Sequence, residues 1–157
     1  MRILVVSDSH GAVHRLREVL ALHPEASVLI HLGDGARDPA QAADLIGERR
    51  LIRVRGNCDF GSPLPANALE EIAGTRIFCT HGHLEHVKSG PQMLCEKARA
   101  QTARIALYGH THEAVTTRSD GLYLMNPGAL QNGSYGMIDL EPGVLFCHTA
   151  SLLRPAP

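Results

Sequence analysis

The sequence has no tryptophan and only three tyrosines and three phenylalanines among its 157 residues. It also has no apolar run near the roughly 20 residues that a membrane-spanning helix needs. Residues 1–6 form a short strand-like run without the arrangement of a signal peptide. These absences argue against a membrane protein and against an exported one, so we expect a cytoplasmic protein.

An excess of charge of one sign is missing too. Fifteen Lys and Arg residues face sixteen Asp and Glu residues, which leaves a net charge of -1. This balance gives no strong signal for binding nucleic acid or an anionic membrane through bulk charge. The four cysteines (Cys58, Cys79, Cys95 and Cys147) have neither a Cys-x-x-Cys pair nor zinc-ribbon spacing. We therefore expect reduced thiols rather than a disulfide framework.

The length suits a single domain over residues 1–157. Strands and helices alternate in the first third of the chain, an arrangement that produces a parallel sheet with right-handed crossovers. The continuous β-branched runs predict buried strands, and the 3.6-residue spacing predicts helices. The expected strands are 2–7, 27–32 and 51–54, and the expected helices are 13–22 and 39–46, the second with Asp38 as its N-cap.

The rest of the chain reads differently, because short strands are separated by turn residues. The expected elements are a hairpin over 69–80, a helix over 91–102, a strand over 104–108, and hairpins turning at Asp120-Gly121, Asn126-Pro127-Gly128 and Glu141-Pro142-Gly143. About ten strands and three helices are best packed as an α/β fold with a two-sheet β-sandwich flanked by helices. Residues 153–157 are expected to form a loose tail.

Histidine is abundant, with ten in the chain, and several follow predicted strands directly. Five successive strands each end in side chains that can ligate a metal. These are Asp8 and His10, then Asp34, then Asn57-Cys58-Asp59, then His81 and His83, and finally His110 and His112. In open α/β folds the carboxyl ends of neighbouring strands meet at one rim. We therefore expect these side chains to share one cleft.

Seven of these side chains are the candidate metal ligands: Asp8, His10, Asp34, Asn57, His81, His110 and His112. Carboxylate oxygens together with imidazole nitrogens suit manganese, iron, zinc or nickel, and we expect manganese first. Seven ligands exceed the needs of one tetrahedral ion. Two divalent ions about 3.5–4 Å apart, sharing a carboxylate, would use them all.

The ordered motifs DSH, GD, GNCD, HGH and GHTH resemble those of the calcineurin-like metallophosphoesterase superfamily, and the compact length resembles its small bacterial and archaeal phosphodiesterase branch. The resemblance runs from Arg2 to about Gly128. It implies a two-sheet sandwich flanked by helices. It also implies one metal on Asp8, His10 and His112, another on Asn57, His81 and His110, and Asp34 bridging both.

The implied activity is dinuclear, metal-dependent hydrolysis of a small phosphoester, in the first place a diester, by in-line attack of a metal-bridging hydroxide. Asn57 would stabilise charge on the phosphoryl oxygens. Many relatives carry a histidine after the GN pair to protonate the departing oxygen, and here Cys58 stands in that place. His83 is then a stand-in proton donor, and Asp59 is expected to orient its neighbours.

Each residue also has an ordinary structural interpretation. Asp8 alone would more often be a helix cap, Asp34 a turn residue, and single histidines satisfied strand-end residues. A protein-interaction scaffold of the same fold, as in the retromer subunit that resembles this family, is the second hypothesis. Such scaffolds lose histidine ligands, whereas all seven positions are filled here, which favours an enzyme. A cyclic nucleotide, another nucleotide and a glycerophosphodiester remain alternative substrates, and the apolar hairpins after Leu122 are a candidate surface for a homo-oligomer.

Overall fold

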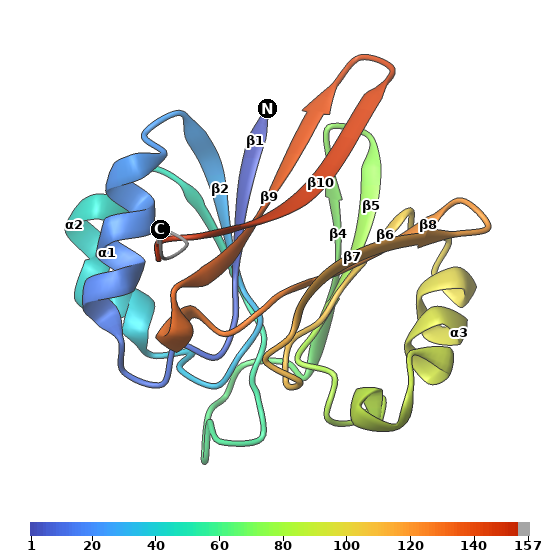
Figure 1. The fold of residues 1–157 in the computed structure, drawn as a ribbon, viewed down its shortest axis with the longest axis horizontal. Helices are drawn as coiled ribbons and strands as arrows, with labels where there is room; N and C mark the ends of the chain where they lie inside the picture. Colours follow the sequence, from blue (N-terminus) through green and yellow to red (C-terminus); the bar gives the residue numbers. More distant parts are fainter. Residues whose placement is uncertain (154–157) are drawn as a thin grey trace.

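The computed structural model describes residues 1–153 as two five-stranded sheets packed face to face (Figure 1). Of the tail expected at 153–157, residues 154–157 lie outside the described residues. The first sheet has the order β10-β9-β1-β2-β3, in which β1, β2 and β3 are parallel and β9 and β10 are antiparallel. Its strands are β1 (Arg2–Val6), β2 (Ala26–His31), β3 (Arg50–Arg53), β9 (Ser134–Glu141) and β10 (Val144–Ser151).

The second sheet has the order β4-β5-β6-β8-β7. Its three central strands are parallel, and the two edge strands pair with them in the antiparallel sense. The strands are β4 (Asn67–Ile72), β5 (Thr75–Thr80), β6 (Ile105–Leu107), β7 (Ala114–Ser119) and β8 (Leu122–Pro127). The two sheets and their helices confirm the predicted fold class.

Helices cover the outer face of each sheet. Figure 1 shows α1 (Val13–Leu22) and α2 (Ala43–Ile46) against the first sheet and α3 (Gln92–Ala100) against the second. The part of the chain that the structure describes also has three short 3-10 segments: η1 (Asp38–Ala42), η2 (Val87–Ser89) and η3 (Leu130–Asn132). Within residues 1–153, no helix combines the length and the apolar character needed to cross a membrane.

The strand β1 shows why both faces of a sheet are filled. Side chains alternate between the faces of a strand, so Ile3 and Val5 point into the core between the sheets while Leu4 and Val6 pack against α1. All four are fully buried. Burying each such side chain stabilises the fold by about 1.5–3 kcal/mol. Because both faces of β1 are buried, successive residues of the strand are all apolar.

Two local predictions are wrong. The helix expected at 39–46 is a 3-10 turn followed by the short α2, and the side chain of Asp38 makes no N-cap hydrogen bond. Its carboxylate instead accepts hydrogen bonds from the Ser9 hydroxyl and the Gly11 amide. The Asn126-Pro127-Gly128 turn does not close a hairpin, because β8 and β9 belong to different sheets and the chain crosses between them there.

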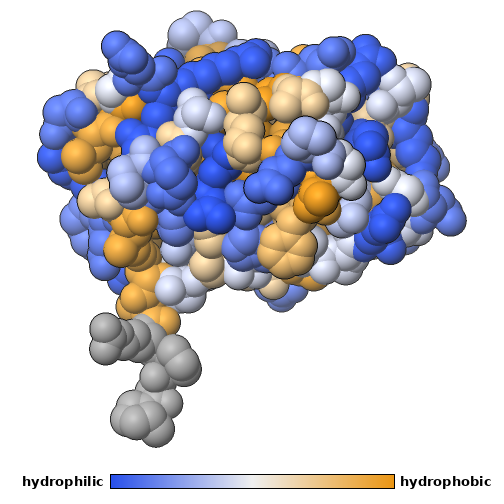
Figure 2. Space-filling model, turned by 90° about the horizontal axis from the view of Figure 1, so that it is seen from above, coloured by the Kyte–Doolittle hydropathy of each residue, from blue (hydrophilic) through white to orange (hydrophobic). Residues whose placement is uncertain are grey.

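The hairpin turns at Ala73-Gly74 and Glu141-Pro142-Gly143 lie together at one end of the sandwich, where they border a cleft of about 610 Å³. Arg104, Arg118 and Tyr123 line the same cleft. Figure 2 looks onto this end and shows hydrophobic residues in patches among hydrophilic ones. None of the predicted site residues lines this cleft.

Candidate metal centre

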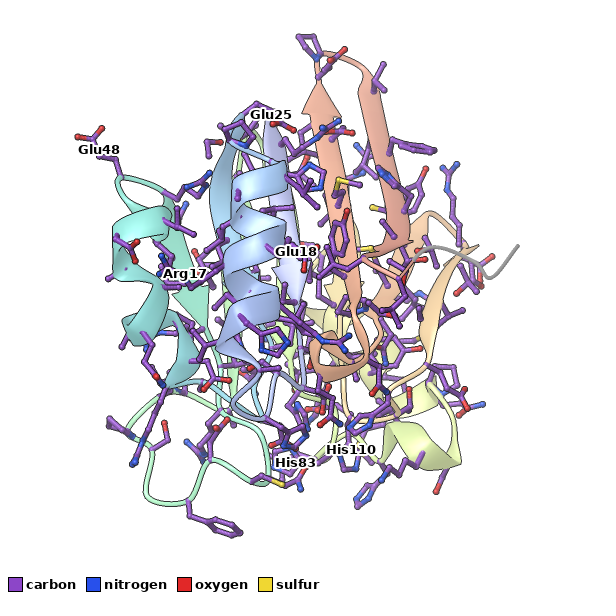
Figure 3. All side chains as sticks on the ribbon, turned by 60° about the vertical axis from the view of Figure 1, so that its left-hand side comes forward. Arg17, Glu18, Glu25, Glu48, His83 and His110 are labelled. Carbon is purple, nitrogen blue, oxygen red and sulfur yellow. The ribbon has the colours of Figure 1, made fainter. Side chains whose placement is uncertain are left out.

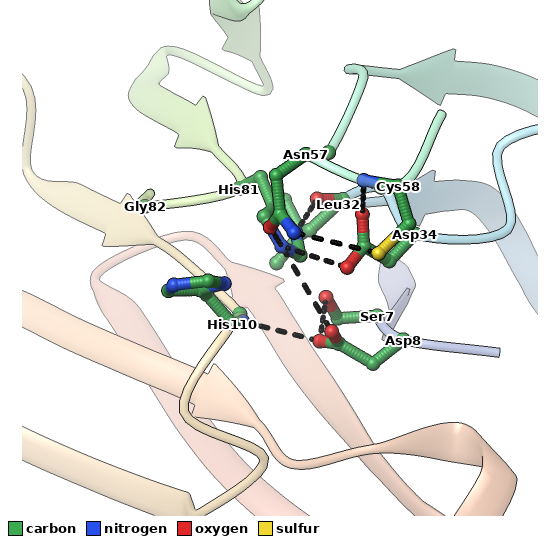
Figure 4. Close-up of polar contacts among 12 residues, drawn as sticks. Ser7, Asp8, Leu32, Asp34, Asn57, Cys58, His81, Gly82 and His110 are labelled. Atoms are coloured by element: carbon green, nitrogen blue, oxygen red, sulfur yellow. Dashed lines mark hydrogen bonds and ion pairs between the residues drawn. The ribbon is translucent and has the colours of Figure 1, made fainter. Parts of the chain in front are cut away.

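The predicted site residues gather at the other end of the sandwich, in the loops that follow β1, β2, β3, β5 and β6. Figure 3 labels His83 and His110 there, and Figure 4 shows the polar contacts among the neighbouring side chains. The structure brings all seven candidate ligands into one cluster, as the convergence of parallel strand ends predicts.

The first group contains Asp8, His10 and His112. The Oδ1 atom of Asp8 lies 3.0 Å from Nε2 of His112 and 3.8 Å from Nε2 of His10. The other carboxylate oxygen of Asp8 accepts hydrogen bonds from the Ser7 hydroxyl (2.6 Å) and the His110 amide (3.2 Å). These two bonds orient the fully buried carboxylate, so that Oδ1 faces the imidazoles.

The second group is built around the fully buried His81. Its Nδ1–H donates to the Leu32 carbonyl at 2.9 Å, and a carbonyl can only accept. Its Nε2 therefore points towards Asn57 Oδ1 at 3.1 Å and Asp34 Oδ2 at 3.3 Å. The rings of His81 and His110 lie 5.1 Å apart in an edge-to-face arrangement.

Asp34 lies between the two groups. Its Oδ2 is 3.3 Å from His81 Nε2 and 3.9 Å from His10 Nε2. Its Oδ1 accepts the Cys58 amide hydrogen at 2.7 Å. Burial by itself would raise the pKa of Asp34, but the bonds from His81 and the Cys58 amide hold that pKa well below its usual range. The carboxylate is therefore charged and faces both histidines.

The donor atoms of this cluster fit a divalent cation. In the neutral His81 ring, Nε2 carries a lone pair, yet it faces two oxygens that also carry lone pairs. Such atoms repel one another unless a proton or a cation lies between them. Burial lowers the pKa of His81, but Asp34 and Asp8 outweigh it and raise that pKa. The same electrostatic field attracts a metal ion, and Asp8, Asp34 and His81 have ligand atoms within 4.8 Å of one another.

Five of the seven candidate ligands adopt the left-handed backbone conformation. Their φ angles are 52° for Asp8, 43° for His10, 54° for Asp34, 67° for His110 and 62° for His112. Residues other than glycine rarely adopt these angles, and strained residues of this kind cluster at functional sites. The conformation turns the chain sharply at each strand end and aims the side chain back over the rim of the sheet.

Two glycines allow the loops after β2 and β3 to touch. A Cβ atom on Gly33 would lie 2.4 Å from the Gly56 nitrogen, and one on Gly56 would lie 2.1 Å from Asp34 Oδ1. Only a residue without a Cβ fits at this approach. The close approach brings Asn57 next to Asp34.

Asp59 joins the same two loops. Its carboxylate accepts four backbone hydrogen bonds, from Asp34, Gly35, Ala36 and Gly56, at 2.7–3.0 Å. Partial burial would raise the pKa of Asp59, but these amide bonds lower it. All four hydrogen bonds come from backbone amides, so the carboxylate fixes the loop that carries Asp34 relative to the loop that carries Asn57.

Cys58 and His83 both lie next to candidate ligands of the cluster. The exposed Cys58 thiol forms a group with His10 and Asp34 whose ligand atoms are within 4.8 Å of one another. Partial burial and the neighbouring carboxylate of Asp34 raise the pKa of Cys58. The ring of His83 lies 5.4 Å from that of His81 and 6.2 Å from that of His110. Burial and the nearby His81 lower the pKa of His83.

The structure also identifies one positioning residue, Asn126, that the sequence did not reveal. The fully buried Asn126 donates to the Gly109 carbonyl (3.0 Å) and to the Thr111 hydroxyl (2.9 Å), and so holds the loop that carries His110 and His112. An asparagine inside an apolar strand was the available signal.

A second positioning chain links His31, Ser9 and Asp38. The Gly33 amide donates to His31 Nδ1 at 3.1 Å, so His31 Nε2–H donates to the Ser9 hydroxyl at 2.9 Å. That hydroxyl donates in turn to Asp38 Oδ2 at 2.5 Å. Burial lowers the pKa of His31 to about 4, so the ring is neutral and the chain of donors is fixed.

Comparisons with known proteins agree with this geometry. The model of the calcineurin-like phosphoesterase superfamily domain matches residues 1–143. Phosphodiesterase YfcE of Escherichia coli is 30% identical over an alignment of 171 positions that covers 88% of each chain.

Solved structures share the fold. The crystal structure of a conserved uncharacterized protein, a predicted phosphoesterase from Streptococcus pneumoniae, superposes with a TM-score of 0.81 at 27% identity, covering 96% of this chain and 88% of that one. Vps29 of Chaetomium thermophilum superposes with a TM-score of 0.80 at 18% identity over 98% of this chain and 90% of its own, which is a likeness of fold alone. The match to the family model over most of the sequence and the clustered Asp and His side chains lead to one conclusion: the chain belongs to the calcineurin-like phosphoesterase superfamily.

Proposed function

We propose that this metal-dependent phosphoesterase is a cytoplasmic phosphodiesterase with two divalent cations, manganese in the first place. Asp8, His10 and His112 would hold one cation, and Asn57, His81 and His110 the other. Asp34 would bridge the two. The position of Asp34 Oδ2, 3.3 Å from His81 and 3.9 Å from His10, is the observation that carries this proposal.

When bound, two cations would lower the pKa of a water molecule and offset charge on the phosphoryl oxygens. The chain prepares the site for them. The Ser7 hydroxyl and the His110 amide orient Asp8, and the Leu32 carbonyl fixes the tautomer of His81. Asn57 is exposed at the edge of the cluster, where its amide can ligate a metal through oxygen and donate to a phosphoryl oxygen through nitrogen.

The groups beside the cluster indicate a preference for acidic leaving groups. The raised pKa of Cys58 makes its thiol a weak acid, and a weak acid transfers its proton poorly to a departing oxygen. The lowered pKa of His83 keeps its imidazole neutral at neutral pH. An ester whose leaving group departs as a stable anion needs neither donor, so diesters with such groups are the expected substrates.

The test combines metal analysis with hydrolysis of bis(4-nitrophenyl) phosphate in manganese. We expect bound metal and turnover in the wild type, and loss of both in Asp34→Asn. Asp44→Asn is the matched control, because Asp44 lies on α2 with a side chain that is 62% exposed and paired only with Arg17 among residues 1–153. A wild-type protein with neither metal nor turnover would instead support a protein-interaction scaffold of the same fold.

A further inference from the structure

A second cleft, of about 450 Å³, opens directly beside the candidate metal centre. It shares His10 and Cys58 with the cluster described above, and the remaining walls come from the loops after β1, β2 and β3. Its size lies within the range of about 300–1,000 Å³ that is usual for ligand sites. A phosphoester held at the metal centre would therefore extend one of its ester groups into this cleft.

Phe60 forms one wall of this cleft. Its side chain is 85% exposed, the largest fraction among the exposed large hydrophobic residues of the described chain. A single exposed apolar residue needs no explanation, but this ring borders a cleft that is continuous with a candidate active site. Aromatic rings in such positions serve as stacking platforms for flat ligand groups.

The backbone next to Phe60 is anchored, although the ring itself is exposed. The preceding residue, Asp59, is anchored by its four backbone hydrogen bonds, and the Ser62 amide donates to the Asp59 carbonyl at 3.1 Å. Phe60 therefore directly follows a residue whose backbone position is fixed. A ring carried by anchored backbone loses less conformational entropy when a ligand stacks on it than a ring on a mobile loop does.

Arg37, on the loop after β2, also lines the cleft and adds hydrogen-bond donors to it. Its guanidinium makes no side-chain hydrogen bond or ion pair with any of residues 1–153 that is shorter than 3.5 or 4.0 Å, respectively. Five N–H donors are thus available to a ligand. They complement the ring nitrogens and carbonyl oxygens of a heteroaromatic group rather than a hydrocarbon ring.

We propose that this cleft binds the nucleobase of a nucleotide ester whose phosphate lies at the metal centre, with the base stacked on Phe60 and hydrogen-bonded by Arg37. The inference rests on the proposed function, because it places the phosphate at the metal cluster. It narrows the substrate class to nucleotide phosphoesters.

The experiment compares two ligands that share a phosphate and a sugar. Manganese-loaded protein is titrated calorimetrically with adenosine 5′-monophosphate and with ribose 5-phosphate, and the ratio of their dissociation constants isolates the contribution of the base. We expect the nucleotide to bind about tenfold more tightly, as stacking of one base provides. Phe60→Ala should bring the ratio close to one, whereas Phe60→Trp should preserve it. Arg37→Gln should weaken the nucleotide more than the sugar phosphate.

Phe146→Ala is the matched control, because Phe146 is 56% exposed on β10 and does not line this cleft. It should leave the ratio unchanged. Equal affinities for the two ligands in the wild type, or a ratio unaffected by Phe60→Ala, would overturn the proposal. Hydrolysis of bis(4-nitrophenyl) phosphate is measured in parallel. If that activity is present and the base adds no affinity, only the nucleobase site is wrong, whereas absence of the activity removes the proposed function itself.

Discussion

Replacing Asp59 by asparagine tests whether one carboxylate holds the candidate metal centre together. The two oxygens of Asp59 each accept two of its four amide bonds. An asparagine of the same shape keeps one oxygen and places an NH₂ group opposite the other two amides. Two bonds to a charged acceptor are lost, and two N–H donors then face another donor. Because a bond to a charged group contributes about 1.5–3 kcal/mol and the site is only half-buried, we expect a loss of about 3 kcal/mol in the free energy of unfolding.

The assay is urea denaturation followed by circular dichroism, since the chain has no tryptophan. Manganese affinity is measured in parallel by calorimetric titration. Because the affected loops carry Asp34 and Asn57, the affinity should fall together with the stability. Asp120→Asn is the control: Asp120 is a left-handed turn residue with φ of 48° and a side chain that is 88% exposed. If Asp59→Asn unfolds within about 0.5 kcal/mol of the wild type and binds manganese equally well, the carboxylate does not hold the two loops in place.

Three further predictions concern the proton donor, the buried histidine and the loop contact. Cys58→His should raise turnover of esters with basic leaving groups by about tenfold or more, measured against 4-nitrophenyl esters, whose rate should change little. The pKa of His31 is about 4 when folded against 6.5 when unfolded, so the unfolded state takes up the proton first and stability falls as the pH drops from 6.5 to 4. In His31→Gln, the free energy of unfolding measured by denaturation should fall by about 3 kcal/mol less than in the wild type over this pH range. The same fall in the variant and the wild type would contradict a neutral, buried ring. Gly33→Ala should lower the free energy of unfolding by more than about 3 kcal/mol, because the added Cβ would lie 2.4 Å from the Gly56 nitrogen. The control Gly121→Ala, at φ of 79° in open space, should lower it by about 1 kcal/mol. Thermal unfolding measures both.

The sandwich and the rim of the site were accessible from the sequence because both depend on local patterns. A short apolar run rich in β-branched residues, such as residues 3–6, predicts a strand covered on both faces. When such runs alternate with helices, the strands form a parallel sheet, and their carboxyl ends meet at one rim of that sheet. Asp8 and His81 could therefore be placed at one rim although 73 positions separate them in the numbering.

The roles that escaped prediction depend on partners distant in sequence. Asp38 precedes a proline and a helical pattern, so local propensity favours an N-cap. In the structure, the carboxylate instead accepts a hydrogen bond from the hydroxyl of Ser9, 29 residues away in the sequence. Asn126 looks like a turn residue, and its Oδ1 does accept the Gly128 amide hydrogen, but its NH₂ group donates to the distant loop at Gly109 and Thr111. Such contacts are set by the crossover between the sheets, which the sequence pattern does not encode locally.

The left-handed conformations at the site bear on the choice between enzyme and scaffold. Nine non-glycine residues among residues 1–153 have positive φ, and five of them are candidate ligands. Of the other four, Ala73, Thr102 and Asp120 lie outside the five ligand loops, and His86 ends the loop that carries His81. Each strained residue costs about 1 kcal/mol or more, a substantial fraction of the about 5–15 kcal/mol by which a domain is stable. A scaffold gains nothing from this cost at a buried carboxylate cluster. A metal centre does, because cation binding stabilises only the conformation in which the strained ligands converge.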